Sequence, residues 1–252
     1  MEHISPKKRS VFSEEKRGMS REQIKIVAIA AMTVNHIALV FFLPGTIVFE
    51  VFVDTGYITA ITMCFFLVEG YYHTHSKVAY MQRLAIFGVI SQLPYTLALG
   101  QKQLNMMFTL LICFLMIYVV DKIKCKLLAV ILTVILFCCT YYCSWSFRAA
   151  AFTILFVLTY KRKETFVIPY TAAFIIQFAV SLYEYQLSYS IGLAFILALG
   201  ASLGVVISGC LISRYNGQCT NSHKQISKWF FYLYYPLHLA LLFIIKLALG
   251  GK

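Results

Sequence analysis

Long apolar runs separated by short polar segments recur along the whole chain. A membrane-spanning helix needs roughly 20 mainly apolar residues, with about 17 to 25 tolerated. On this criterion the sequence predicts an all-α, polytopic membrane bundle of nine spans, at 24–43, 47–71, 83–99, 106–120, 127–143, 148–160, 166–183, 188–212 and 228–248. Eight or ten spans are the alternatives, because the sixth run is short and Glu50 and Asp54 interrupt the second.

The composition agrees with this prediction, since 60% of the residues are apolar and 13% are charged, which is outside the range of soluble domains. Residues 1–22 are polar and basic, without the apolar core of a signal peptide, so we expect a cytoplasmic tail. Residues 23–252 are expected to form one transmembrane helical domain. The eight cysteines contain no CxxC pair, and we expect most of them to be free, with a disulfide feasible only near Cys143 on the outer side.

The formal charge of +12 favours an orientation in the membrane rather than nucleic-acid binding. The basic residues lie in short connections between apolar runs and do not form one patch. When the connections are taken alternately, one set holds 17 Lys and Arg residues and the other holds three. Cytoplasmic loops carry such an excess, so the N-terminus is predicted to lie in the cytoplasm and the C-terminus outside.

A polar pair, Asn35 and His36, lies well inside the first apolar run. An ionisable group within a span is costly and is by default a functional hypothesis. Lys25 precedes His36 by eleven residues, which puts both side chains on one helix face about 16.5 Å apart. A cation at the mouth and a base deep in the membrane suit a long ligand with an anionic head and a reactive tip, such as a coenzyme A thioester. The simpler alternatives are a positive-inside anchor for Lys25 and a helix–helix hydrogen bond for His36.

The last apolar run carries a second buried histidine, His238, with Tyr235 three residues before it. His238 lies ten residues, or about 15 Å, into its run, which is similar to the depth of His36. These residues either contribute to a pocket or make structural hydrogen bonds. Near the cytoplasmic face, Glu69 ends the second run and Arg83 opens the third, and the two either pair with each other or line a site.

Two further polar pairs give weaker signals. His73 and His75 have no additional ligands at metal-binding spacing, so the sequence predicts no metal site. Glu50 and Asp54 have the i,i+4 spacing of neighbours on one helix face, where two acids would suit a cationic acceptor. A solvated loop is the favoured interpretation of this second pair.

Several segments together resemble the TraX family of membrane proteins. They are IKIVAIAAMTVNHIALVFF, FFLVEGYYHT with the following YMQRL and SQLPY, NMMFTLL, and KWFFYLYYPLHLALL. The resemblance covers both ends and much of the first half in order, whereas 127–225 matches only as generic apolar spans. The family favours an Asp where this chain has Asn35, which puts a carboxylate role at that position in doubt.

The resemblance implies a bacterial cytoplasmic-membrane protein. TraX-like proteins are associated with N-terminal acetylation of conjugative pilin, and they are similar to membrane acyltransferases in which a basic residue, ten others and a histidine occupy the first helix. Lys25 and His36 fit that arrangement.

We therefore expect an acyl-CoA-dependent transferase, with acetyl-CoA or another acyl-CoA as donor and a peptide, glycan, lipid or small amine as acceptor. His36 would act as general base or acyl carrier, and Asn35 would orient it or donate to the oxyanion. Lys25 and Arg83 would hold the phosphates. Glu69, Tyr235 and His238 would complete the pocket.

Two other classes of function fit the sequence. A proton-coupled transporter would use the intramembrane histidines as a relay and would release no CoA. A non-catalytic assembly factor for a surface fibre would use its many aromatic side chains for packing and would keep its partner complex after His36→Ala.

Overall fold

A computed structural model describes residues 18–160, 167–217 and 224–250, without the side chains of 224–228. Its elements are α1 (Arg21–Phe41), α2 (Ile47–Asp54), α3 (Gly56–His73), α4 (Lys77–Leu99), α5 (Met106–Lys122), α6 (Lys126–Cys139), the 3-10 turn η1 (Thr140–Tyr142), α7 (Ser146–Thr159), α8 (Val167–Gln186), α9 (Ile191–Ser213) and α10 (Lys224–Ala248). No β-strand occurs in the described ranges, where only isolated bridges are found. The prediction of an all-α fold is confirmed.

Each predicted apolar run is helical, but the runs differ in how well they suit a bilayer. Within the described chain, five are long and apolar enough to cross a membrane, namely Arg21–Phe41, Ile47–His73, Val167–Gln186, Ile191–Ser213 and Trp229–Ala248. The segments Lys126–Tyr142 and Ser146–Thr159 are apolar but shorter. The second run is broken at Thr55 into α2 and α3.

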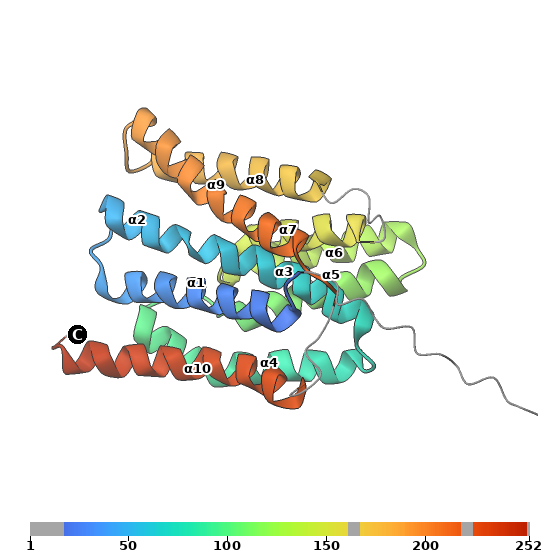
Figure 1. Ribbon diagram of the computed structural model, residues 1–252. Helices are drawn as coiled ribbons and strands as arrows, with labels where there is room; N and C mark the ends of the chain where they lie inside the picture. Colours follow the sequence, from blue (N-terminus) through green and yellow to red (C-terminus); the bar gives the residue numbers. More distant parts are fainter. Residues whose placement is uncertain (1–17, 161–166, 218–223, 251–252) are drawn as a thin grey trace, which may run out of the picture.

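The helices pack side by side in one bundle (Figure 1). α2 and α3 lie along one side of α1, and α10 with α4 lies along the other (Figure 1). The hairpin of α8 and α9 covers the side of α2 and α3 that faces away from α1. This arrangement brings the first and last apolar runs of the chain into direct contact.

Hydrogen bonds and small residues hold α1 close to α3. The Thr59 hydroxyl donates to the Ala28 carbonyl at 2.6 Å, and the Asn35 amide donates to the Val53 carbonyl at 2.6 Å. Val53 lies in the last turn of α2, where carbonyl groups lack regular helical partners. At the break, a Cβ on Gly56 would lie 2.8 Å from the Asn35 amide nitrogen. Glycine at position 56 therefore allows this contact, and we infer that Asn35 stabilises the broken helix.

The structure corrects the interpretation of the pair Glu50 and Asp54 as a solvated loop. Both residues are in α2, and Asp54 is only 7% exposed. The hydroxyl of Tyr185 donates to Asp54 at 2.8 Å, and that of Tyr189 donates to Glu50 at 2.9 Å. The prediction was wrong because the α8–α9 hairpin covers this face. The described cysteines are all free, including Cys143, and Cys219 lies outside the described residues.

Candidate active site

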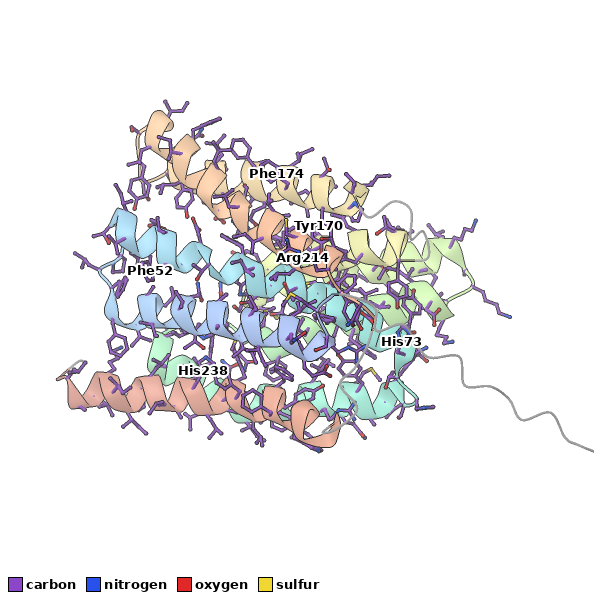
Figure 2. The ribbon with its side chains drawn as sticks, in the orientation of Figure 1. Phe52, His73, Tyr170, Phe174, Arg214 and His238 are labelled. Atoms are coloured by element: carbon purple, nitrogen blue, oxygen red, sulfur yellow. The ribbon has the colours of Figure 1, made fainter. Side chains whose placement is uncertain are left out.

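The two intramembrane histidines meet where α1 packs against α10. His36 Nδ1 lies 2.8 Å from His238 Nε2, and the two rings stack with centroids 5.0 Å apart and an angle of 14°. His36 is 8% exposed and His238 is 6% exposed. Figure 2 shows His238 between Phe52 and His73, which mark opposite ends of the bundle. The similar depth predicted from the sequence thus corresponds to a direct contact.

The hydrogen bonds of this pair fix the tautomer of each neutral ring. His238 Nδ1 lies 2.9 Å from the carbonyl oxygen of Tyr234. A carbonyl oxygen only accepts, so His238 Nδ1 carries a hydrogen and His238 Nε2 is an acceptor. His36 Nδ1 must then donate to His238, which leaves the lone pair on His36 Nε2. Among the described residues, His36 Nε2 has no hydrogen-bond partner, so this nitrogen has the form that a base or nucleophile needs.

A small cavity adjoins this histidine. It has a volume of about 20 Å³, and its lining includes Asn35, His36, Tyr235, Met32, Met106 and Trp145. The ring centroid of Tyr235 lies 6.2 Å from that of His36. The structure therefore brings three of the predicted site residues, Asn35, His36 and Tyr235, to one cavity. His238 contacts His36 but is not part of the cavity lining.

A much larger cavity opens at the end of the bundle where α1 and α4 begin and α3 ends. Its volume is about 800 Å³, within the range of cofactor-binding sites. Its polar lining includes Arg21, Lys25, Arg83, His73 and His75, and its aromatic lining includes Phe66, Tyr80, Phe231 and Tyr232. Three permanent cations together with aromatic faces suit a ligand that carries both phosphates and a ring system.

Glu69 and Arg83 do not pair with each other. Glu69 is 7% exposed and forms an ion pair with Arg21 at 3.3 Å. The hydroxyl of Tyr215 donates to the same Glu69 oxygen at 2.7 Å. Burial and this bond to the carboxylate raise the pKa of Tyr215, so its phenol stays protonated and keeps donating.

Arg83 has a different environment. Its guanidinium lies 5.5 Å from the ring centroid of Tyr80. No described carboxylate is within ion-pair distance of Arg83. Its charge therefore remains available to a ligand in the large cavity.

The large and small cavities lie end to end along the same four helices. On α10, Tyr232 lines the large cavity and Tyr235 the small one. On α5 the corresponding residues are the consecutive Met107 and Met106. α1 and α3 also line both cavities. The cavities are separate in this conformation, and methionine side chains, which are unbranched and adaptable, line both of them.

Arg21, which lines the large cavity, and Trp145, which lines the small one, were not predicted from the sequence. Arg21 precedes Lys25 by four residues, so helical spacing was a signal that both point to the same side. Trp145 has a left-handed backbone conformation with φ 68°, which no sequence pattern predicts.

Comparison with known proteins shows what the chain is similar to. A family model described as TraX protein matches residues 20–246, a range that includes all the residues assigned to both cavities. The chain is 28% identical over 239 residues to a probable fimbrial assembly protein FimC, serogroup H1, of Dichelobacter nodosus, covering 90% of this chain and 96% of that protein. No solved structure matches the chain.

Proposed function

Because the chain belongs to the TraX family, we propose that it is a membrane-embedded acyltransferase that moves an acetyl or other acyl group from acyl-CoA to an amine or hydroxyl acceptor. The name of its relative from Dichelobacter nodosus points to a setting in fimbrial or pilus assembly. A peptide N-terminus is the acceptor that fits this setting.

The observation that carries the proposal is the free lone pair on Nε2 of His36, a residue that is oriented by His238 and lines the small cavity. His36 takes the proton of the attacking amine or hydroxyl as the new bond to the acyl carbon forms. The resulting imidazolium then protonates the departing CoA thiolate, so the proton moves from acceptor to leaving group. A route in which His36 itself carries the acyl group uses the same lone pair.

The large cavity supports the choice of donor. Lys25 and Arg83 supply charge for the phosphates of CoA, and the aromatic walls supply surface for its adenine ring. Lys25 and His36 are about 16.5 Å apart along α1, a distance that suits the extended arm between the phosphates and the thioester. For the acyl group to reach His36, the methionine side chains between the cavities must move aside.

The proposed topology follows the charge distribution. All nine apolar runs lie in the bilayer, with the shorter helices inserted among the longer ones, in a bacterial cytoplasmic membrane. The cation-lined cavity opens on the side of the Lys- and Arg-rich connections, which is cytoplasmic. Acyl-CoA is therefore drawn from the cytoplasm.

Purified protein in nanodiscs tests the proposal. Acetyl-CoA is added to the wild type and to His36→Ala, and both donor binding and slow release of free CoA are followed. We expect both proteins to bind the donor and only the wild type to release thiol. Equal thiol release by the two proteins would remove His36 from the reaction. Absence of donor binding to the intact wild type would favour a transporter, which uptake driven by a pH gradient in liposomes would then test.

A further inference from the structure

We propose that the hydroxyl of Tyr235 is the hydrogen-bond donor that stabilises the oxyanion formed on the acyl carbonyl during transfer. This inference rests on the proposed function, and it gives Tyr235 a catalytic role.

Tyr235 occupies the position that such a donor needs. It is 3% exposed and lines the small cavity together with His36. Its ring centroid lies 6.2 Å from that of His36 and 5.6 Å from that of His238. An acyl carbon placed next to His36 Nε2 therefore has Tyr235 as a neighbour.

The hydroxyl of Tyr235 also has a polar neighbour. The backbone N–H of Met106, the first residue of α5, interacts favourably with its oxygen. This neighbour is a donor, so the hydroxyl hydrogen is left for another group, and no described residue accepts it in a hydrogen bond. Met106 and Tyr235 both line the small cavity.

The N-terminus of α5 strengthens Tyr235 as a donor. α5 is 17 residues long, and its axis presents partial positive charge at Met106. Asn105 caps the helix, since its side chain accepts from the Met107 N–H at 3.0 Å. Partial positive charge near the phenol oxygen of Tyr235 makes its O–H a better donor to a negatively charged oxygen. Preorganised donors of this kind supply much of the rate enhancement in acyl transfer.

The acceptor lone pair forms a bond to the acyl carbon, and the C=O π electrons move onto oxygen, where the Tyr235 O–H donates to the new negative charge. His36 Nε2 takes the acceptor proton. When the C=O bond re-forms, the C–S bond breaks, and the thiolate receives that proton from His36. Tyr235 keeps its own proton throughout.

The adjacent tyrosine provides a matched control. The Tyr234 hydroxyl lies 2.7 Å from the Thr33 hydroxyl oxygen. Thr33 donates to the Ile29 carbonyl at 2.9 Å, so Tyr234 donates to Thr33 and its hydrogen is already used. Tyr234→Phe thus removes one hydrogen bond between α1 and α10 without touching the cavity that contains His36.

The first test compares Tyr235→Phe with Tyr234→Phe in nanodiscs. Removal of one oxyanion donor typically lowers kcat about 100- to 1,000-fold, and we expect that loss for Tyr235→Phe with an unchanged Kd for acetyl-CoA. Tyr234→Phe should stay within about 5-fold of wild type, the effect of one neutral hydrogen bond. Normal turnover of Tyr235→Phe would overturn the assignment.

A dithioester donor separates catalysis from structure. Its C=S group replaces the carbonyl oxygen with sulfur, which is a weak acceptor, so the Tyr235 hydroxyl has little left to stabilise. We expect the ratio of wild-type to Tyr235→Phe kcat to shrink to less than about 10-fold with this donor. An unchanged ratio would show that Tyr235 acts only on the fold and would overturn the inference. If neither wild type nor His36→Ala releases thiol from acetyl-CoA, the proposed function fails and this inference fails with it; if only the Tyr235 results disagree, the proposed function stands.

Discussion

Substitution of His238 tests whether this residue holds His36 in its active tautomer. His238→Met keeps an unbranched side chain of similar size but provides no strong acceptor for His36 Nδ1–H. His238→Gln places a carbonyl oxygen near the former Nε2 and so keeps an acceptor. The two variants differ chiefly in this one bond, which is 2.8 Å long and buried at both ends.

The expected loss of kcat in His238→Met follows from the free energy that this hydrogen bond contributes. A hydrogen bond between helices in a membrane contributes about 1 to 2 kcal/mol in model peptides. Without this bond, the His36 tautomer that has its lone pair on Nε2 loses about that much stabilisation. Because 1.4 kcal/mol corresponds to about a tenfold change, kcat should fall roughly 5- to 30-fold. His238→Gln should recover most of the loss.

The assay is thiol release from acetyl-CoA by each variant, with donor Kd measured in parallel. Nitrogen-15 NMR of histidine-labelled protein reports independently which nitrogen of His36 carries the hydrogen. Wild-type turnover in His238→Met would refute the reasoning. Equal losses in His238→Met and His238→Gln would also refute it, because the acceptor would then be irrelevant.

Two further predictions address donor binding and packing. Lys25→Glu should weaken acetyl-CoA binding about 10- to 100-fold, which is the range for the loss of a charge-assisted hydrogen bond, and should largely keep kcat at saturating donor. Isothermal titration calorimetry measures the affinity, and an unchanged affinity would remove Lys25 from the site. Gly56→Ala should lower stability by about 1 to 3 kcal/mol, because the added Cβ would meet the Asn35 side chain at 2.8 Å. The control Gly200→Ala, which meets nothing within 4 Å, should unfold at the wild-type temperature or slightly higher; equal midpoints for the two variants would contradict this packing.

Hydrophobic runs predicted the helices well because each run must satisfy its own backbone within a membrane. The same reasoning did not foresee the break at Thr55, which depends on a donor from α1 reaching Val53. Nor did it foresee that the α8–α9 hairpin buries Asp54, since that contact is set by how distant helices pack.

The candidate site was predictable only in part. Helical periodicity placed Lys25 and His36 on one face, and similar depths related His36 to His238. Their contact joins residues 202 positions apart, so only the packing of α1 against α10 reveals it. Glu69 was expected to have Arg83 as a candidate partner, but it pairs with Arg21. Both arginines lie at the same end of the bundle as Glu69, and only the folded structure shows which of the two is within ion-pair distance.

The most direct test of the account is a structure of the protein in nanodiscs with a stable acetyl-CoA analogue in which a methylene group replaces the thioester sulfur. We predict density for the phosphates beside Lys25 and Arg83 in the large cavity and for the acyl carbonyl between His36 Nε2 and the Tyr235 hydroxyl, with the methionines between the cavities displaced. An analogue bound elsewhere, or a fully formed bundle with both cavities empty at saturating analogue, would contradict the claim that the two cavities form one acyl-transfer site.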